Sequence, residues 1–104
     1  CVEFFKKDNK IYVNEMALRV HNTYHISIDC CNISQFDIHI RSILGLNIIK
    51  PVFMYNSIMY NIISNLQNID DIFKLIGENK YIFVKKYFKK ELGKRKIGHV
   101  NIIL

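Results

Sequence analysis

The sequence predicts an α+β fold, in which strands and helices occur in runs and not in alternating βα units. Three observations lead to this prediction. Two strand-like runs open the chain around a polar turn, an amphipathic helix follows, and strand-like runs dominate the second half. The expected order is strand, strand, loop, helix, strand, helix, strand and strand. At 104 residues the chain is long enough for one domain at most.

The opening runs predict an antiparallel hairpin. Residues 1–5 and 11–13 are strand-like, and the polar link between them contains the turn-forming pair Asp8 and Asn9. A strand at the first residue has no neighbour on its outer side, and the first residue is not Met. We therefore expect this sequence to be part of a longer protein.

Two carboxylates stand on the two strands of this hairpin. Glu3 and Glu15 are twelve residues apart, and a hairpin closed around the turn allows both to face one side. Two carboxylates on neighbouring strands suit Mg²⁺, which takes a few protein oxygens and completes its shell with water and phosphate. The alternative is that each glutamate is simply solvated.

The loop after the second strand concentrates polar side chains. Arg19, His21 and Asn22 together resemble an oxyanion cradle, because a guanidinium fork matches planar oxyanions and the imidazole and amide add donors. The alternative for Arg19 is a surface salt bridge. His21 and His25, with Cys30 and Cys31 beyond, also allow a zinc site, but no tight ligand pair completes one.

A helix is predicted from about residue 35 to residue 44. Ser34 with Asp37 three residues later resembles a capping box, and Gly45 is a suitable C-terminal stop. The apolar residues fall on one stripe: Phe36, Ile40, Ile43 and Leu44. The remaining predicted elements are short alternating residues 26–31, a strand in at least the first half of 52–63, a helix at 69–76 ended by Gly77, and strands at 81–88 and 97–103.

The net charge of +6 favours anionic partners such as phosphate or a nucleotide. The loop at residues 89–96 holds five of the positive charges; it suits a phosphate, a solvated hairpin tip or, less well, RNA. No run of twenty apolar residues is present, so we expect no membrane span. Three cysteines, two of them adjacent, form no disulfide framework, which suits a reducing cytoplasm.

Several motifs resemble one family. Residues 14–25, NEMALRVHNTYH, are similar to the NEIAPRxHNSGH signature of N5-carboxyaminoimidazole ribonucleotide synthetases, the ATP-grasp carboxylases of purine biosynthesis. Residues 2–5 (VEFF) resemble the VExF strand of that family, residues 34–41 (SQFDIHIR) its SQFEQHxR helix start, residues 45–46 (GL) its GLPL turn, and residues 95–100 (RKIGHV) its RKMGHV strand. The resemblance runs along the whole chain in the right order.

The resemblance implies a set of site residues. Glu3 and Glu15 match the magnesium-binding glutamates, and Asn14 joins them in the metal- and nucleotide-binding set. The residues implied around bicarbonate, or the carboxyphosphate made from it, are Arg19, His21 and Asn22. Those implied near the phosphate of the ribonucleotide are Lys89, Arg95 and Lys96. The sequence departs from the pattern at Leu18, where the family has Pro, Tyr24, where it has Gly, Leu92, where it has Arg, and Lys94, where it has Gly.

The resemblance also implies an organisation and an activity. Residues 1–46 match the end of an ATP-grasp domain, and residues 47–104 match a small C-terminal β-rich subdomain. The implied enzyme is a cytoplasmic homodimer that uses ATP, bicarbonate and 5-aminoimidazole ribonucleotide, with Mg²⁺ or Mn²⁺ as cofactor. Without the N-terminal part of that enzyme we expect no ATP turnover by these residues alone. The alternatives are a non-catalytic remnant and a basic module that binds RNA or another polyanion.

Overall fold

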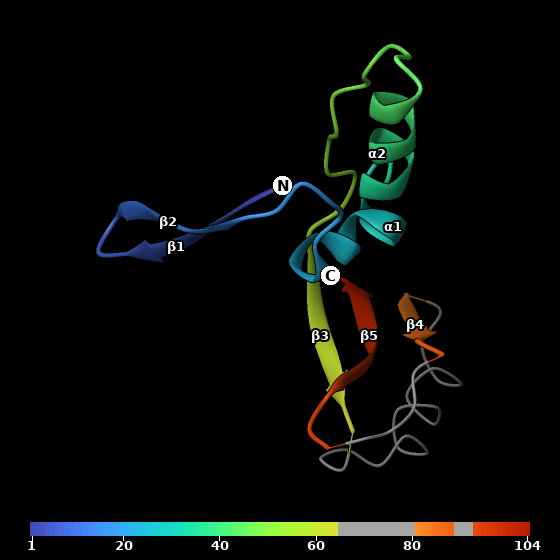
Figure 1. Ribbon diagram of the computed structural model, residues 1–104. Helices are drawn as coiled ribbons and strands as arrows, with labels where there is room; N and C mark the ends of the chain where they lie inside the picture. The colour runs from blue at the N-terminus through green and yellow to red at the C-terminus, as the bar shows by residue number, and fades with distance from the viewer. Residues whose placement is uncertain (65–80, 89–92) are drawn as a thin grey trace.

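The computed structural model describes residues 1–64, 81–88 and 93–104. The described elements are β1 (Val2–Lys7), β2 (Lys10–Met16), η1 (Asn22–Ile26), α1 (Ser27–Cys30), α2 (Gln35–Ile43), β3 (Ser57–Ile63), β4 (Ile82–Lys86) and β5 (Lys96–Ile103). They form a two-stranded sheet, a group of short helices and a three-stranded sheet, so the predicted α+β class is confirmed (Figure 1). The helix predicted at residues 69–76 lies outside the described residues.

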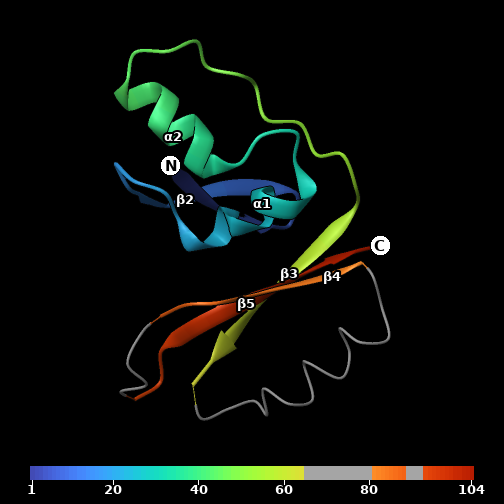
Figure 2. The same ribbon diagram turned by 90° about the vertical axis from the view of Figure 1, so that its right-hand side faces the viewer.

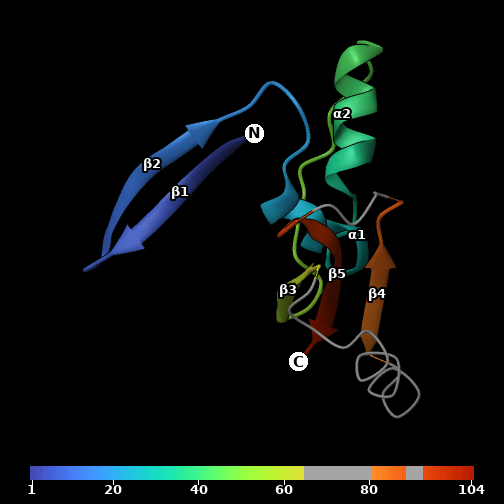
Figure 3. The same cartoon turned by 60° about the horizontal axis from the view of Figure 1, so that its bottom comes forward.

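The predicted hairpin is confirmed. β1 and β2 pair antiparallel, and Asp8 and Asn9 close the turn with φ angles of 48° and 60°. Positive φ at both central residues is the geometry that matches the twist of a two-residue hairpin, and Asn and Asp tolerate it best after Gly. The ribbon projects away from the helices and from the other sheet (Figure 3).

Residues 26–30 are helical, although residues 26–31 alternate in the way that is typical of a strand, and Cys31 has an extended backbone. The 3₁₀ helix η1 runs directly into α1. The Ser27 hydroxyl donates to the carbonyl of Tyr24 at 2.7 Å and accepts the backbone N–H of Gln35 at 3.0 Å. These bonds close a compact turn around the buried Ser27 and Cys30, which a strand would not allow.

α2 follows its sequence signals closely. The Ser34 hydroxyl accepts the backbone N–H of Asp37, and the helix stops before Gly45, whose φ of 64° favours glycine. Its predicted apolar stripe is present but exposed in this chain, with Ile43 at 67% and Ile40 at 54%. α1 and η1 lie between this helix and the three-stranded sheet (Figure 2).

The segment before β3 is not a strand, so the strand predicted for the first half of residues 52–63 is wrong; β3 occupies the second half. Residues 52–54 instead run along the linker between α1 and α2. The N–H of Met54 donates to the carbonyl of Cys30 at 2.8 Å, and the N–H of Asn32 donates to the carbonyl of Val52 at 3.1 Å. These hydrogen bonds give the backbone groups of this segment partners without adding a strand to a sheet.

β5 is the central strand of the second sheet, between β3 and β4, and both pairings are antiparallel. The predicted strands at 81–88 and 97–103 are therefore confirmed. The small apolar core lies on this sheet and consists of Ile62, Ile97 and Val100 with the partly buried Ile82, Val84 and Ile102. Gly98 permits the close pairing, because a Cβ there would collide with the backbone oxygen of Lys85.

A buried amide joins the sheet to the helices. The Asn101 side chain on β5 is fully buried, and its Nδ2 donates to Asp29 Oδ2 at 2.6 Å and to the carbonyl of His25 at 3.3 Å. This contact fixes η1 and α1 on the second sheet. Among the described residues, no helix has the length and apolar character needed to cross a membrane.

Candidate active site

The two glutamates of the hairpin face each other. Glu3 and Glu15 are paired in the register of β1 and β2, and directly paired residues project to the same face. The His21 ring lies between them: Nδ1 is 3.2 Å from Glu3 Oε2, and Nε2 contacts Glu15 Oε1. One ligand atom from each of the three residues lies within 4.8 Å of the others. The predicted convergence of the two carboxylates is confirmed.

The carboxylate of Glu3 is held by two neutral donors. Thr23 Oγ1 and Asn14 Nδ2 each donate to it at 2.7 Å. These bonds, that of Thr23 first, hold the pKa of Glu3 below its usual value, and the electrostatic effects of the neighbouring His21 and Lys96 side chains act in the same direction. Glu3 is therefore kept ionised, as a metal ligand or a general electrostatic partner must be. Asn14 was predicted to belong to the site, and Thr23 was not.

Gln35 holds the backbone of His21 in place. Its Oε1 accepts the N–H of His21 at 2.9 Å, and its Nε2 donates to the carbonyl of His21 at 2.8 Å and to His25 Nδ1 at 2.6 Å. The carbonyl oxygen and the NH₂ group of this side chain therefore both have partners, and Gln35 is only 7% exposed. Sequence reasoning missed this residue, although an amide at the first position of a helix, facing a polar loop, is a usable signal.

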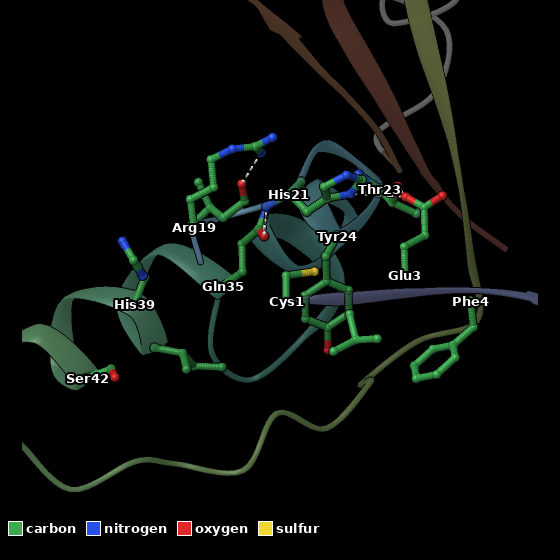
Figure 4. A pocket seen from close by; sticks show the side chains of 13 residues that line it. Cys1, Glu3, Phe4, Arg19, His21, Thr23, Tyr24, Gln35, His39 and Ser42 are labelled. Atoms are coloured by element: carbon green, nitrogen blue, oxygen red, sulfur yellow. Dashed lines mark hydrogen bonds and ion pairs between the residues drawn. The ribbon is translucent and has the colours of Figure 1, made fainter. Parts of the chain in front are cut away.

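Arg19 and Asn22 lie apart from the two carboxylates. The Arg19 guanidinium donates to the carbonyl of Val20 at 3.1 Å, seen as a dashed line in Figure 4, and the side chain is exposed. The Asn22 amide turns towards Tyr87 and donates to its hydroxyl at 3.2 Å. Of the three predicted oxyanion residues, only His21 contacts the carboxylates in the described part of the chain.

A cavity of about 570 Å³ nevertheless unites part of the predicted set. It lies between β1, the loop before η1 and α2, and its walls include Glu3, Arg19, His21 and Gln35. Figure 4 shows these side chains around it together with Tyr24. The cavity is therefore bordered at one side by the carboxylate cluster and at another by the guanidinium.

The predicted phosphate residues are only partly described. Lys89 lies outside the described residues. The backbone N–H of Arg95 donates to Ser64 Oγ at 3.1 Å, which fixes the start of β5. Lys96 is close enough to Glu3 for its charge to help lower the pKa of that carboxyl. This places a cation of the second sheet on the side of the carboxylate cluster.

The chemistry of the cluster fits a hard divalent cation. Two carboxylates from neighbouring strands supply oxygen ligands, and one is already oriented by hydrogen bonds from Asn14 and Thr23. Such outer hydrogen bonds fix the direction of ligand oxygens in metal sites. The two carboxylates are ligands that suit Mg²⁺ or Mn²⁺, and the Cys30 and Cys31 thiols that the zinc alternative would use are not part of the cluster.

Comparison with known families divides the chain into two matches. Residues 1–36 match the ATP-grasp domain model, and residues 57–104 match the model of the phosphoribosylaminoimidazole carboxylase C-terminal domain. The first match contains the carboxylate cluster, and the second contains the three-stranded sheet. The part of the chain that carries the cluster is therefore the end of an ATP-grasp domain.

Curated relatives match nearly the whole chain. The N5-carboxyaminoimidazole ribonucleotide synthase of Saccharolobus solfataricus is 40% identical over 103 residues, which is 98% of this chain and 27% of the relative. The synthase of Bacillus subtilis is 34% identical over 96% of this chain and 26% of the relative. The chain thus spans about a quarter of the length of these relatives.

Solved structures agree. The ADP complex of an N5-carboxyaminoimidazole ribonucleotide synthetase matches with a TM-score of 0.82 and 35% identity over 99% of this chain and 27% of that chain. The Aspergillus clavatus synthase, in complex with ADP and 5-aminoimidazole ribonucleotide, matches with a TM-score of 0.78 and 33% identity over 99% and 29%. This chain belongs to the N5-carboxyaminoimidazole ribonucleotide synthetase family and corresponds to its C-terminal portion.

Proposed function

We propose that this chain forms part of a ligase that carboxylates 5-aminoimidazole ribonucleotide to N5-carboxyaminoimidazole ribonucleotide with ATP and bicarbonate. The observation that carries the proposal is the cluster of Glu3, Glu15 and His21 on the ATP-grasp side of the chain. The family match and the relatives named above supply the substrate class. The division into residues 1–46 and 47–104 is part of the same proposal.

Glu3 and Glu15 would hold the divalent cation, Mg²⁺ or Mn²⁺, and Asn14 and Thr23 would keep Glu3 turned towards it. When bound, the cation would neutralise and align the phosphates of ATP. His21 lies where it can hold either carboxylate or donate to an oxyanion beside them. Its backbone is fixed by Gln35, so the imidazole is presented from a rigid position.

The reaction has two stages. An oxygen of bicarbonate attacks the γ-phosphorus of ATP, the bond to the bridging oxygen of ADP breaks, and carboxyphosphate forms. The exocyclic amine of the ribonucleotide then takes the carboxyl group, loses a proton and releases inorganic phosphate. Arg19, which borders the cavity, would stabilise the charge that builds on the transferred group, and Asn22 would donate to the oxyanion.

The basic end of β5 would face the phosphate of the ribonucleotide. Lys96 already directs its charge towards the site, and Arg95 precedes it on the same strand start. Lys89 completes the proposed set. An anionic substrate that arrives beside a metal-bound nucleotide needs such cations, because its charge would otherwise repel the ATP phosphates.

The test of the metal assignment is Mn²⁺ binding to this chain, followed by electron paramagnetic resonance. Glu15→Gln should weaken binding at least about tenfold, since one charged ligand becomes neutral. Asp8→Asn makes the same change at the turn of the same hairpin and should leave binding unaltered. Equal Mn²⁺ affinities of the Glu15→Gln and unaltered chains would contradict the assignment.

The test of the reaction is phosphate release by the full-length protein encoded by the reading frame that contains this chain. Release should require ATP, bicarbonate and 5-aminoimidazole ribonucleotide together, and Glu15→Gln should abolish it. The isolated 104-residue chain should show none. Release that does not depend on bicarbonate would contradict the proposed reaction.

A further inference from the structure

A partly buried series of hydrogen bonds links Asn22 to the second sheet. Asn22 Nδ2 donates to the Tyr87 hydroxyl at 3.2 Å, and the Tyr87 hydroxyl lies 2.7 Å from His99 Nδ1. Because the hydroxyl accepts from Asn22, its own proton is available for His99 Nδ1. Tyr87 follows β4 and His99 lies on β5, so two strands of the C-terminal sheet together reach the loop that carries the site.

The side chains joined by these hydrogen bonds are held rigidly. His99 is 1% exposed, and the backbone N–H of Tyr87 donates to the carbonyl of Ile97 at 2.6 Å, which ties the residue to β5. The His25 ring packs against both, with centroid distances of 5.8 Å to Tyr87 and 5.3 Å to His99. The hydroxyl therefore has little freedom to move away from Asn22.

The protonation states suit this arrangement. Burial lowers the pKa of His99 and raises the pKa of Tyr87, so both side chains are neutral near pH 7. A neutral His99 that accepts at Nδ1 carries its proton on Nε2, and Tyr87 keeps the proton that it donates. Each of the two hydrogen bonds then has one donor and one acceptor, and the amide of Asn22 has one fixed orientation.

Asn22 is the residue through which these hydrogen bonds reach the site. It follows His21 directly and begins η1, and its Oδ1 is buried without a protein partner in the described part of the chain. The Nδ2 of Asn22 carries two hydrogens, and donating one to Tyr87 also fixes the direction of the second, which is the donor that an oxyanion would accept from. The preceding residue, His21, contacts both carboxylates, so the amide lies next to the cluster in sequence.

We propose that Tyr87 and His99 are positioning residues for the oxyanion site: they orient the amide of Asn22, so the C-terminal sheet sets the affinity for bicarbonate. This inference rests on the proposed function. The three-stranded sheet, which the C-terminal domain model matches, would then do more than pack against the helices. It would help to form the site at the end of the ATP-grasp domain.

The kinetic test uses the full-length protein. Tyr87→Phe keeps the ring and removes the hydroxyl, and it should raise the KM for bicarbonate roughly three- to tenfold, the worth of one hydrogen bond between neutral groups. The KM for ATP should stay unchanged, which a general loss of structure would not allow. Tyr60→Phe, on an exposed position of β3, is the matched control and should change neither constant.

A second pair of variants tests His99 itself. His99→Asn retains an acceptor near the position of Nδ1 and should keep the KM for bicarbonate close to that of the unaltered protein. His99→Leu removes the acceptor and should behave like Tyr87→Phe. A KM for bicarbonate in Tyr87→Phe equal to that in Tyr60→Phe would overturn the inference and leave the proposed function standing.

A measurement on the 104-residue chain separates the two proposals. In ¹⁵N-labelled chain, the side-chain amide resonances of Asn22 should shift in Tyr87→Phe and stay in place in Tyr60→Phe. An unshifted Asn22 amide would overturn the positioning role even if the protein is an active carboxylase. The amide of Asn22 could instead shift as expected in the 104-residue chain while the full-length protein shows no bicarbonate-dependent turnover. That result would overturn the proposed function and, with it, the role in bicarbonate affinity.

Discussion

Replacing Gln35 with Met removes all three hydrogen bonds of that side chain while nearly keeping its volume. The N–H and carbonyl of His21 then lose their partners, at 2.9 Å and 2.8 Å, and His25 Nδ1 loses its donor at 2.6 Å. A buried polar group without a partner costs about 1–3 kcal/mol. Because these groups are only partly buried, we expect the free energy of unfolding to fall by about 2–4 kcal/mol.

This loss is large compared with the total of about 5–15 kcal/mol that is typical of folded proteins. Urea unfolding measures it, and hydrogen exchange at the His21 amide localises it. Gln35→Glu distinguishes the contribution of the accepted hydrogen bond from that of the two donated ones, because the carboxylate still accepts from the His21 N–H but donates nothing. It should retain protection of the His21 amide better than Gln35→Met does.

Ser42→Met, at an exposed position of the same helix, is the control and should change the free energy of unfolding by less than about 0.5 kcal/mol. The reasoning also predicts weaker Mn²⁺ binding in Gln35→Met, since His21 would no longer be fixed beside the carboxylates. A Gln35→Met chain as stable as Ser42→Met, with unchanged exchange at His21, would refute the role of the clamp.

Three further predictions concern other contacts. Thr23→Val should raise the pKa of Glu3 towards its ordinary 4.5, because the Thr23 bond is the largest cause of the lowering, and carboxyl NMR titration measures this; an unchanged midpoint would contradict it. The pKa of His99 is lowered from 6.5, so its neutral form favours the fold: stability should be full above that pH and fall as the pH drops below it. Urea unfolding at several pH values checks this, and the dependence should flatten in His99→Asn. Gly98→Ala should cost about 1–3 kcal/mol, since its Cβ would collide with the Lys85 oxygen, and thermal unfolding should show the loss.

The elements that were predicted correctly are those whose causes are local. The hairpin turn depends on Asp8 and Asn9, which tolerate positive φ, and α2 depends on a hydroxyl cap at Ser34 and a glycine at position 45. These preferences act over a few residues. They hold whatever the rest of the chain does.

Two segments whose composition is misleading have a different origin. Residues 26–31 alternate like a strand, but the Ser27 hydroxyl bonds to Tyr24 and Gln35 and closes a helical turn. Residues 52–54 have strand-like composition, but their backbone pairs with residues near Cys30 that are about twenty positions away along the chain. At Ser27 side-chain hydrogen bonds three and eight residues away decided the conformation, and at residues 52–54 backbone partners about twenty positions away did so.

The same distinction runs through the site. The spacing of Glu3 and Glu15 about a turn was enough to predict that both carboxylates share a face, since register follows from the turn. Thr23 and Gln35 were missed because their roles depend on where a loop returns to the hairpin and to α2. Arg19 was expected beside the carboxylates, yet its guanidinium bonds to the backbone of Val20.

The sequence by itself determined the α+β class, the hairpin, the capped helix α2, the last two strands and the family. It did so because turn, cap and alternation preferences are properties of neighbouring residues, and because the motifs are specific. Only the tertiary structure decided that His21 lies between the two glutamates, that Gln35 fixes it, and that Tyr87, bonded to His99, reaches Asn22 across 65 positions of sequence. Such contacts depend on how the elements pack in three dimensions, which no short stretch of sequence specifies.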